Sequence, residues 1–410
     1  MGTTWLVEPA RPLDEGAALG DAAKLMRSQV AAVMARAGEW RLSEKEPGPG
    51  AADSGAAAGA RAAYQKAIDG AAYQQAIDIG DPEQAPAAAF NLGLLLAEQG
   101  DVSGALAAFQ IAIDSGHEDY APVASRNVGV LLEGRGDAAG ACTALQTAID
   151  SRDVEQAPAA AYGLGLLLAG QGDVAGARAA FQRAIDSGHA EYAPAASRNL
   201  GVLLAGQGNP AGARAAFQRA IDSGDAEQAP AAAVDLGLLL AGQGDPAGAR
   251  AAYQVAIDSG HEQFAPVAEL FMGEHCTTGD LQARRDYRDR AAAWANPDVL
   301  LSLAELYIAD GDLPRARQML AEAARADMTD AAGYLQLFSA DAPDSDDQTL
   351  RTVSTGADAG DTDGMNMLGL HAALLGDVDL ARSWWARSAA QGDVIAPLLL
   401  SRSALGQQGG

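Results

Sequence analysis

The chain has 410 residues, of which 49% are hydrophobic but only 5% aromatic, and its formal net charge is −26. Phosphate backbones and anionic lipid surfaces repel such a chain, so we expect no nucleic-acid partner and no membrane partner. The two cysteines, Cys142 and Cys276, fit no disulfide framework, and no apolar stretch is long enough to cross a bilayer. We therefore expect a soluble, cytoplasmic protein.

Residues 1–50 contain no repeat and form a separate N-terminal segment, in which the apolar spacing between Leu19 and Trp40 predicts one helix. Residues 51–80 are interpreted as a linker followed by a partial repeat. There the sequence AAYQKAIDG is followed at once by AAYQQAIDI. Nine residues make two and a half helical turns, so a continuous helix would place the copies on opposite faces. We predict a break near Gly70.

Residues 81–260 contain five regular copies of a 36-residue repeat. Its clearest marker is an Ala-Pro dipeptide, with prolines at Pro86, Pro122, Pro158, Pro194, Pro230 and Pro266. A first helix is predicted to begin near each proline, because the first turn of a helix tolerates a missing N–H group. It is predicted to end at a glycine such as Gly100, and Asp101 and its equivalents are suitable N-caps for a second helix.

Each repeat keeps a glycine inside its first helix, at Gly93, Gly129, Gly165, Gly201 and Gly237. Glycine in a helix interior costs about 1 kcal/mol relative to alanine, so its presence in every copy predicts that the two helices approach closely. Ala105, Phe109 and Ala112 share one face of the second helix at helical spacing. A large side chain in place of one of these glycines should separate the pair.

These residues resemble the tetratricopeptide repeat family. Leu92-Gly93, Ala105, Phe109 and Ala112, with their equivalents in the other copies, match the family's helix-turn-helix frame, although the period is 36 residues instead of the usual 34. The glycine and the alanines also resemble Sel1-like repeats. The resemblance covers most of residues 60–392 and implies an all-α fold, a right-handed α-solenoid of antiparallel helix pairs with a concave groove lined by the first helices.

Residues 261–392 are interpreted as degenerate repeats of the same type. In the last of them, Gly369, Ala381 and Trp385 recover the spacing of the regular copies. Residues 393–410 are predicted to form a capping helix and a tail, because a solenoid needs to close the exposed end of its core. The irregular C-terminal repeats are also where we expect any contact between copies of the chain.

The sequence shows no constellation of catalytic residues, and we expect no enzymatic activity, no cofactor and no metal. His117, His189 and His261 lie two repeats apart, about 20 Å at 8–10 Å per helix layer, which is too far to share a metal ion. Gln110 and Asp114 recur in every second helix. These polar rows predict either a ladder that binds a basic partner or a solvated face that was copied with the repeat.

The best candidate site is the predicted groove, at positions about 100–140° around the first helices from their packed faces. These positions are Phe90, Leu94, Arg126, Val130, Tyr162, Leu166, Arg198, Val202, Val234 and Leu238. By resemblance to the family, they would hold an extended or helical peptide whose carboxylates pair with Arg126 and Arg198. The alternative is that the apolar members only pack between neighbouring first helices.

The sequence therefore predicts a non-catalytic interaction scaffold that binds a segment of a partner protein in its concave groove. Two alternatives stay open. One is a self-assembling structural solenoid joined through its C-terminal repeats. The other is a regulatory subunit of an enzyme encoded elsewhere, contacted through residues 1–50.

Overall fold

The computed structural model describes residues 70–277, 279–326, 328–337 and 347–405, and every regular element in these ranges is an α-helix. The helix predicted between Leu19 and Trp40 and most of the predicted linker lie outside the described residues. So does the first copy of the nine-residue duplication, whereas the second copy is helical from residue 70 to residue 79. The described residues fall into two compact units, which divide between residues 196 and 197.

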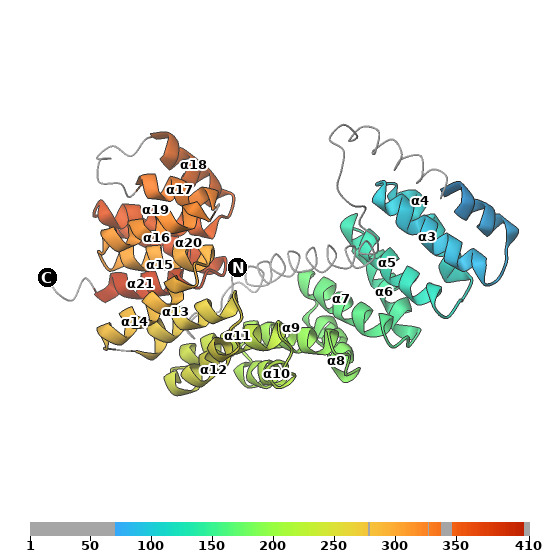
Figure 1. Ribbon diagram of the computed structural model, residues 1–410, viewed down its shortest axis with the longest axis horizontal. Coiled ribbons are helices and arrows are strands. Elements are labelled where there is room, and N and C mark those ends of the chain that lie inside the picture. The colour runs from blue at the N-terminus through green and yellow to red at the C-terminus, as the bar shows by residue number, and fades with distance from the viewer. Residues whose placement is uncertain (1–69, 278, 327, 338–346, 406–410) are drawn as a thin grey trace, which may run out of the picture. The chain divides into compact units, whose positions relative to one another are not determined.

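The first unit consists of helix pairs that follow the regular repeats (Figure 1). Its helices are α3 (Gln84–Glu98), α4 (Val102–Asp114), α5 (Tyr120–Gly134), α6 (Ala138–Asp150), α7 (Gln156–Gly170), α8 (Val174–Asp186) and the first turn of α9 (Tyr192–Gly206). Each first helix packs on its own second helix, and α4 and α6 also pack on the first helix of the following pair. The core of this unit therefore runs continuously from one repeat to the next.

The second unit continues the pattern after residue 197 (Figure 1). Its helices are the rest of α9, α10 (Pro210–Asp222), α11 (Gln228–Gly242), α12 (Pro246–Asp258), α13 (Phe264–Cys276), α14 (Leu281–Ala293), α15 (Pro297–Ala309), α16 (Leu313–Arg325), α17 (Thr329–Leu337), α18 (Asp347–Asp358), α19 (Thr362–Leu374), α20 (Val378–Ala390) and α21 (Ala396–Leu405). From α10 onward, successive helices pack on one another, and α21 packs on α20 and also contacts α15. The all-α solenoid with a C-terminal capping helix is confirmed.

The helix ends confirm the predicted caps. The side chains of Asp101, Asp137, Asp173, Asn209 and Asp245 each accept a hydrogen bond from the backbone N–H three residues further on. Gly100 and Gly116, like their equivalents, have a positive φ, which lets the chain leave one helix and enter the next. Arg152 stands where the other copies have glycine, yet its φ is also positive, at 60°. The turn therefore imposes this conformation even on a residue with a Cβ atom.

The glycines inside the first helices lie against large side chains of the second helices, which confirms the predicted close approach. A Cβ atom on Gly165 would lie 2.5 Å from Cδ1 of Phe181, and one on Gly237 would lie 2.3 Å from Cε1 of Tyr253. Both rings are completely buried. Gly369 and Trp385 repeat the arrangement in α19 and α20, where a Cβ atom on Gly369 would lie 2.3 Å from the indole Nε1 of Trp385.

The pair formed by α12 and α13 contains a half-buried histidine that the regular repeats lack. His275 Nδ1 lies 2.9 Å from the hydroxyl of Tyr253, and the ring of Phe271 stacks on the imidazole at 5.4 Å between centroids. Burial lowers the pKa of His275 to about 4. The imidazole is therefore neutral at physiological pH.

Two glycines of α7 should respond in opposite ways to replacement by alanine. Gly165→Ala should lower the free energy of unfolding by about 1–3 kcal/mol, because the new methyl group overlaps the Phe181 ring. Gly163→Ala should raise it by about 1 kcal/mol through helix propensity, since its nearest neighbour would be Leu145 at 3.9 Å. Urea denaturation followed by circular dichroism measures both, and a stabilising Gly165→Ala would contradict the close-approach interpretation.

Acid should weaken the α12–α13 core through His275. Its folded pKa of about 4 lies below its ordinary value of 6.5, so the unfolded chain takes up the proton first and stability falls as the pH drops from 6.5 to 4. The difference in pKa corresponds to about 3 kcal/mol. Between pH 7 and pH 4, the wild type should lose that much more unfolding free energy than His275→Gln. Equal losses in the two proteins would show that the imidazole stays accessible to protons in the fold.

Candidate functional site

The predicted groove residues of the first unit are largely packed inside it. Phe90 is buried, and its ring lies 5.8 Å from the ring of Phe109 in the second helix and 5.8 Å from that of Tyr120 in the next first helix. Tyr162 repeats this arrangement in α7, where Leu166 is also buried. The two rings thus join consecutive repeats, as the packing alternative expected. Leu94 and Val130 are half-buried.

Arg126 is the polar member of the predicted groove in the first unit. It projects from α5 and is half-buried, and its Nε atom is buried without a hydrogen-bond partner in the part of the chain that the structure describes. Burial raises the pKa of the nearby Tyr192, and the Arg126 guanidinium partly opposes that rise. Arg126 therefore interacts with Tyr192 of α9, while its Nε–H group has no acceptor among the described residues.

Arg198, the equivalent arginine in the second unit, has a different environment. Its Nε donates a 2.7 Å hydrogen bond to Oδ2 of Asp235, whose side chain is 1% exposed. Burial raises the pKa of Asp235, and Arg198 partly offsets that rise by stabilising the carboxylate. The position equivalent to Asp235 in the preceding block is Gly163, which offers no carboxylate. The two arginines thus differ: Arg198 already has an internal anion and Arg126 does not.

The remaining predicted groove residues of the second unit are apolar and buried: Val202, Val234 and Leu238. The sequence predicted that they share one side of α9 and α11, and in the structure neighbouring side chains cover that side. A partner in the second unit would therefore meet little of these side chains.

The polar rows of the second helices form contacts within each helix. Gln110 Nε2 donates a 2.7 Å hydrogen bond to Oδ1 of Asp114, four residues further on, and both side chains are exposed. The pair recurs with distances of 2.7–2.8 Å at residues 146/150, 182/186, 218/222 and 254/258. Each amide compensates the carboxylate at the C-terminal end of its helix, where the helix dipole disfavours negative charge. These contacts favour a solvated, copied face.

The recurring histidines connect consecutive repeats. His189 Nδ1 accepts a hydrogen bond from the backbone N–H of Glu191, and its Nε2 lies 3.1 Å from Oε2 of Glu155 in the preceding repeat. His117 and His261 make the corresponding pairs with Glu83 and Glu227, at 3.6 and 3.3 Å. Among the described residues, no group of three or more His, Cys, Asp or Glu side chains is arranged to hold a metal ion.

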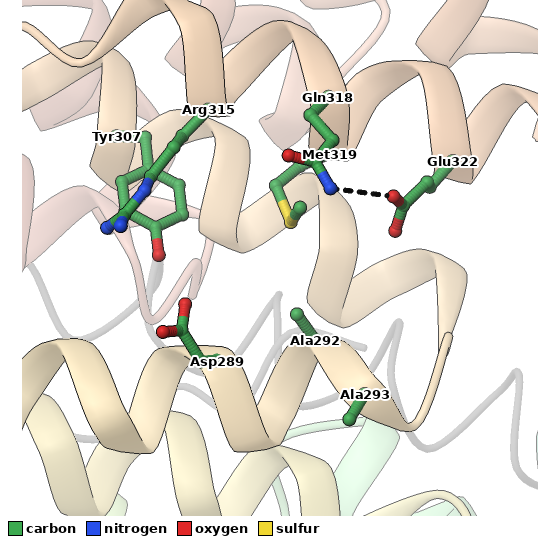
Figure 2. Close-up of a pocket in the computed structure, with 8 residues that line it drawn as sticks. All are labelled: Asp289, Ala292, Ala293, Tyr307, Arg315, Gln318, Met319 and Glu322. Atoms are coloured by element: carbon green, nitrogen blue, oxygen red, sulfur yellow. Dashed lines mark hydrogen bonds between the residues drawn. The ribbon is translucent and has the colours of Figure 1, made fainter.

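A small pocket lies between α14 and the pair formed by α15 and α16 (Figure 2). It has a volume of about 250 Å³ and is lined by Asp289, Ala292, Ala293, Tyr307, Arg315, Gln318, Met319 and Glu322. The guanidinium of Arg315 lies 5.6 Å from the centre of the Tyr307 ring, and Gln318 donates a hydrogen bond to Glu322. Small-molecule sites usually enclose about 300–1,000 Å³, so this pocket does not suggest a substrate site.

One polar cluster was missed by the sequence reasoning. Glu305 of α15 and Asn366 of α19 are 1% and 0% exposed, and the half-buried carboxylates of Asp363 and Asp393 lie around them. Asn366 Nδ2 donates to Glu305 Oε2 at 3.4 Å and to Asp393 Oδ1 at 3.1 Å. A single acid within the apolar run LLSLAELYIA was the signal that could have revealed the cluster. We call these four residues the acidic cluster.

Comparison with known proteins agrees with the repeat pattern. A family model described as tetratricopeptide repeat matches residues 51–119, 129–196, 170–227 and 198–263, and a second tetratricopeptide repeat model matches residues 297–322. No curated protein matches the chain. No helix of the described residues has both the length and the apolar character needed to span a membrane.

Solved structures similar to this chain include two bacterial repeat proteins. A Sel1 repeat protein from Oxalobacter formigenes is 20% identical, with a TM-score of 0.46, over 80% of this chain and 89% of that one. The protective antigen c5321 of uropathogenic Escherichia coli, described as displaying an SLR fold, is 19% identical, with a TM-score of 0.42, over 83% of this chain and 75% of that one. The two tetratricopeptide repeat models together match more than half of the sequence, and the chain belongs to the tetratricopeptide repeat family.

Proposed function

We propose that the protein is a non-catalytic scaffold that binds a segment of a partner protein along its first helices. Tetratricopeptide repeat folds generally serve as protein–protein interaction scaffolds, which supports the general part of the proposal. The single observation that carries the specific part is the environment of Arg126. Its Nε–H group is buried and has no partner among the described residues, and such a group costs free energy until an acceptor reaches it.

A carboxylate of the bound segment would supply that acceptor. Arginine binds carboxylates through charge-assisted and often bidentate hydrogen bonds. Arg126 would therefore select an acidic residue of the bound segment. Leu94 and Val130 are half-buried and leave apolar surface for the neighbouring residues of the segment. Arg198 takes no part in this contact, because Asp235 already accepts its hydrogen bond at 2.7 Å. The proposal therefore places recognition of acidic residues at Arg126.

Replacing Arg126 by glutamate should abolish capture of the partner while helical content stays unchanged. Arg135→Glu is the matched control, because Arg135 is an exposed residue just after the same helix and the change in charge is identical. Quantitative affinity purification from the native host, with circular dichroism of each variant, measures both properties. A chain retained by the wild type and by Arg135→Glu should be lost with Arg126→Glu. Its retention by Arg126→Glu would remove the basis for this groove assignment.

Self-assembly through the C-terminal repeats is a second candidate, favoured by one exposed apolar patch. Leu374, Leu375 and Leu380 lie around the turn between α19 and α20 and are 51%, 75% and 45% exposed. Exposed leucines that lie close together are typical of contact surfaces between proteins. This candidate uses none of the predicted groove residues.

If the patch joins copies of the chain, light scattering should give a molar mass that rises with protein concentration. Leu375→Glu should then return the mass to that of a monomer, since a charge in an apolar contact carries a desolvation cost. Val154→Glu is the control, because Val154 is 78% exposed in a loop of the first unit. A wild type that stays monomeric at every concentration would eliminate self-assembly.

A further inference from the structure

The helix of residues 70–79 lies at the N-terminal end of the described repeats and is the second helix of an incomplete pair. One side of it packs on α3, since a Cβ atom on Gly70 would lie 3.4 Å from Cδ2 of Leu95 and Ile77 contacts the core that α3 and α4 share. The second helices α4, α6, α8 and α12 also pack on a first helix that precedes them. The structure describes no such helix before residue 70.

The side of this helix that a first helix would cover is open. Its sequence AAYQQAIDI corresponds to AAFQRAIDS in α8, so Tyr73 stands where α8 has Phe181. Ala72 is exposed, and Tyr73 and Ala76 are half-buried. Their equivalents in α8 are almost fully covered, with exposed fractions of 3% for Ala180, 0% for Phe181 and 0% for Ala184. We call Ala72, Tyr73 and Ala76 the open face.

The pair formed by α7 and α8 shows what a covering helix must provide. Gly165 of α7 lies against the ring of Phe181, and Leu164 packs in one core with Ala180, with Leu168 at its edge. A covering helix therefore needs a small residue opposite Tyr73, preceded by one larger apolar residue and followed three positions later by another.

Residues 28–38 contain these side chains at the required spacing. In the frame of α7, the corresponding residues are Val30 for Leu164, Ala31 for Gly165, Met34 for Leu168 and Gly38 for Gly172. Gly172 has a φ of 79° and lets the chain leave α7. The segment thus supplies both the apolar stripe and the glycine that ends a first helix.

Two departures from this frame define the extent of the match. Ala31 has a Cβ atom where α7 has glycine, but α15 also has an alanine at this position, Ala304, and still packs on α16. Arg27 stands where α7 has Ala161, which is 2% exposed. The match therefore begins at Ser28, a residue type that is favoured at the N-cap of a helix.

The connection to the open face is long enough for this contact. Residues 39–69 lie between the segment and the helix, and an extended chain of that length spans about 100 Å. Packed helices are about 8–10 Å apart, and the entropy cost of closing a loop rises only slowly with its length.

Residues 51–69 are the rival occupant, because the first match of the tetratricopeptide repeat model begins at residue 51. The spacing of α7 and α8 would place Ala57 opposite Tyr73. The positions of the two leucines would then be Ala56 and Ala60. This segment offers nothing larger than alanine at either position, so it would bury less apolar surface on the open face than Val30 and Met34 would.

We propose that residues 28–38 dock on the open face as the missing first helix and close the N-terminal end of the repeats. Residues 1–50 then have a role within the chain, in place of the contact with a separate enzyme that the sequence left open. The proposal depends on no residue of the predicted groove. Either proposal can therefore fail while the other stands.

Thiol labelling of the full chain tests the proposal. In a background of Cys142→Ala with Cys276→Ala, the probe is Ala72→Cys in the open face. The reference is Gln74→Cys, which is exposed and lies about 200° around the same helix. Reaction of a thiol requires access to the reagent, so the thiol at position 72 should react at least tenfold more slowly than the thiol at position 74.

Charges on the docking side of the segment should remove this protection. Val30→Asp with Met34→Asp should raise the rate at position 72 to that at position 74, since carboxylates in an apolar contact carry a desolvation cost. Val33→Asp with Ala37→Asp is the matched control, because it adds the same charge about 200–240° around the predicted helix from Ala31. Deletion of residues 1–40 should act like the test variant, and circular dichroism verifies that each variant keeps its helices.

Four outcomes would overturn the proposal. Equal rates at positions 72 and 74 in the background chain would show that nothing covers the open face. Protection that survives the deletion, and is lost in Ala56→Asp with Ala60→Asp, would make residues 51–69 the occupant. Protection that disappears on dilution would assign the face to a second copy of the chain. Equal loss of protection in the test variant and its matched control would exclude docking through Val30 and Met34. Arg126→Glu should keep the protection, which separates this test from that of the groove.

Discussion

The contact between a glycine in one helix and a large side chain in the next is the interaction on which the regular repeats depend. The rings of Phe181 and Tyr253 lie where a Cβ atom on Gly165 or Gly237 would be. The other buried side chains of α8 and α12 are alanines. The distance between the two helices of such a pair is therefore determined by one aromatic ring that packs against the backbone of the first helix. The aromatic content of 5% is sufficient because each ring fills the space between two helices.

Packing between repeats has a direct consequence for binding. Phe90 and Tyr162 bridge consecutive repeats through Tyr120 and Tyr192, and the histidine–glutamate pairs connect the same repeats at their loops. Apolar surface used in this way is not available to a partner. The proposed recognition therefore uses a polar group that packing leaves incomplete, the Nε–H of Arg126 in the first unit.

The irregular repeats differ from the copied ones in chemistry as well as in spacing. In the regular copies, Gln110 and Asp114 lie on an exposed face and bond each other, and the buried carboxylate of Asp235 is paired with Arg198. In the later helices, the half-buried His275 lies against Tyr253, and Glu305 is buried against Asn366. Desolvation changes the pKa of both titratable groups. Desolvated titratable groups with neutral hydrogen-bond partners are thus found where the repeat departs from its own pattern.

The sequence by itself determined the repeat, the two helices of each copy, their caps and the glycine at which they meet, because these depend on residues close together in the chain. Only the tertiary structure decided that Arg198 is bound to Asp235 whereas Arg126 keeps an unpartnered Nε. It alone brought Glu305, Asn366 and Asp393 together. The physical reason is that burial and charge pairing arise between helices 27–61 residues apart, where the phase of a helical pattern no longer predicts which side chains meet.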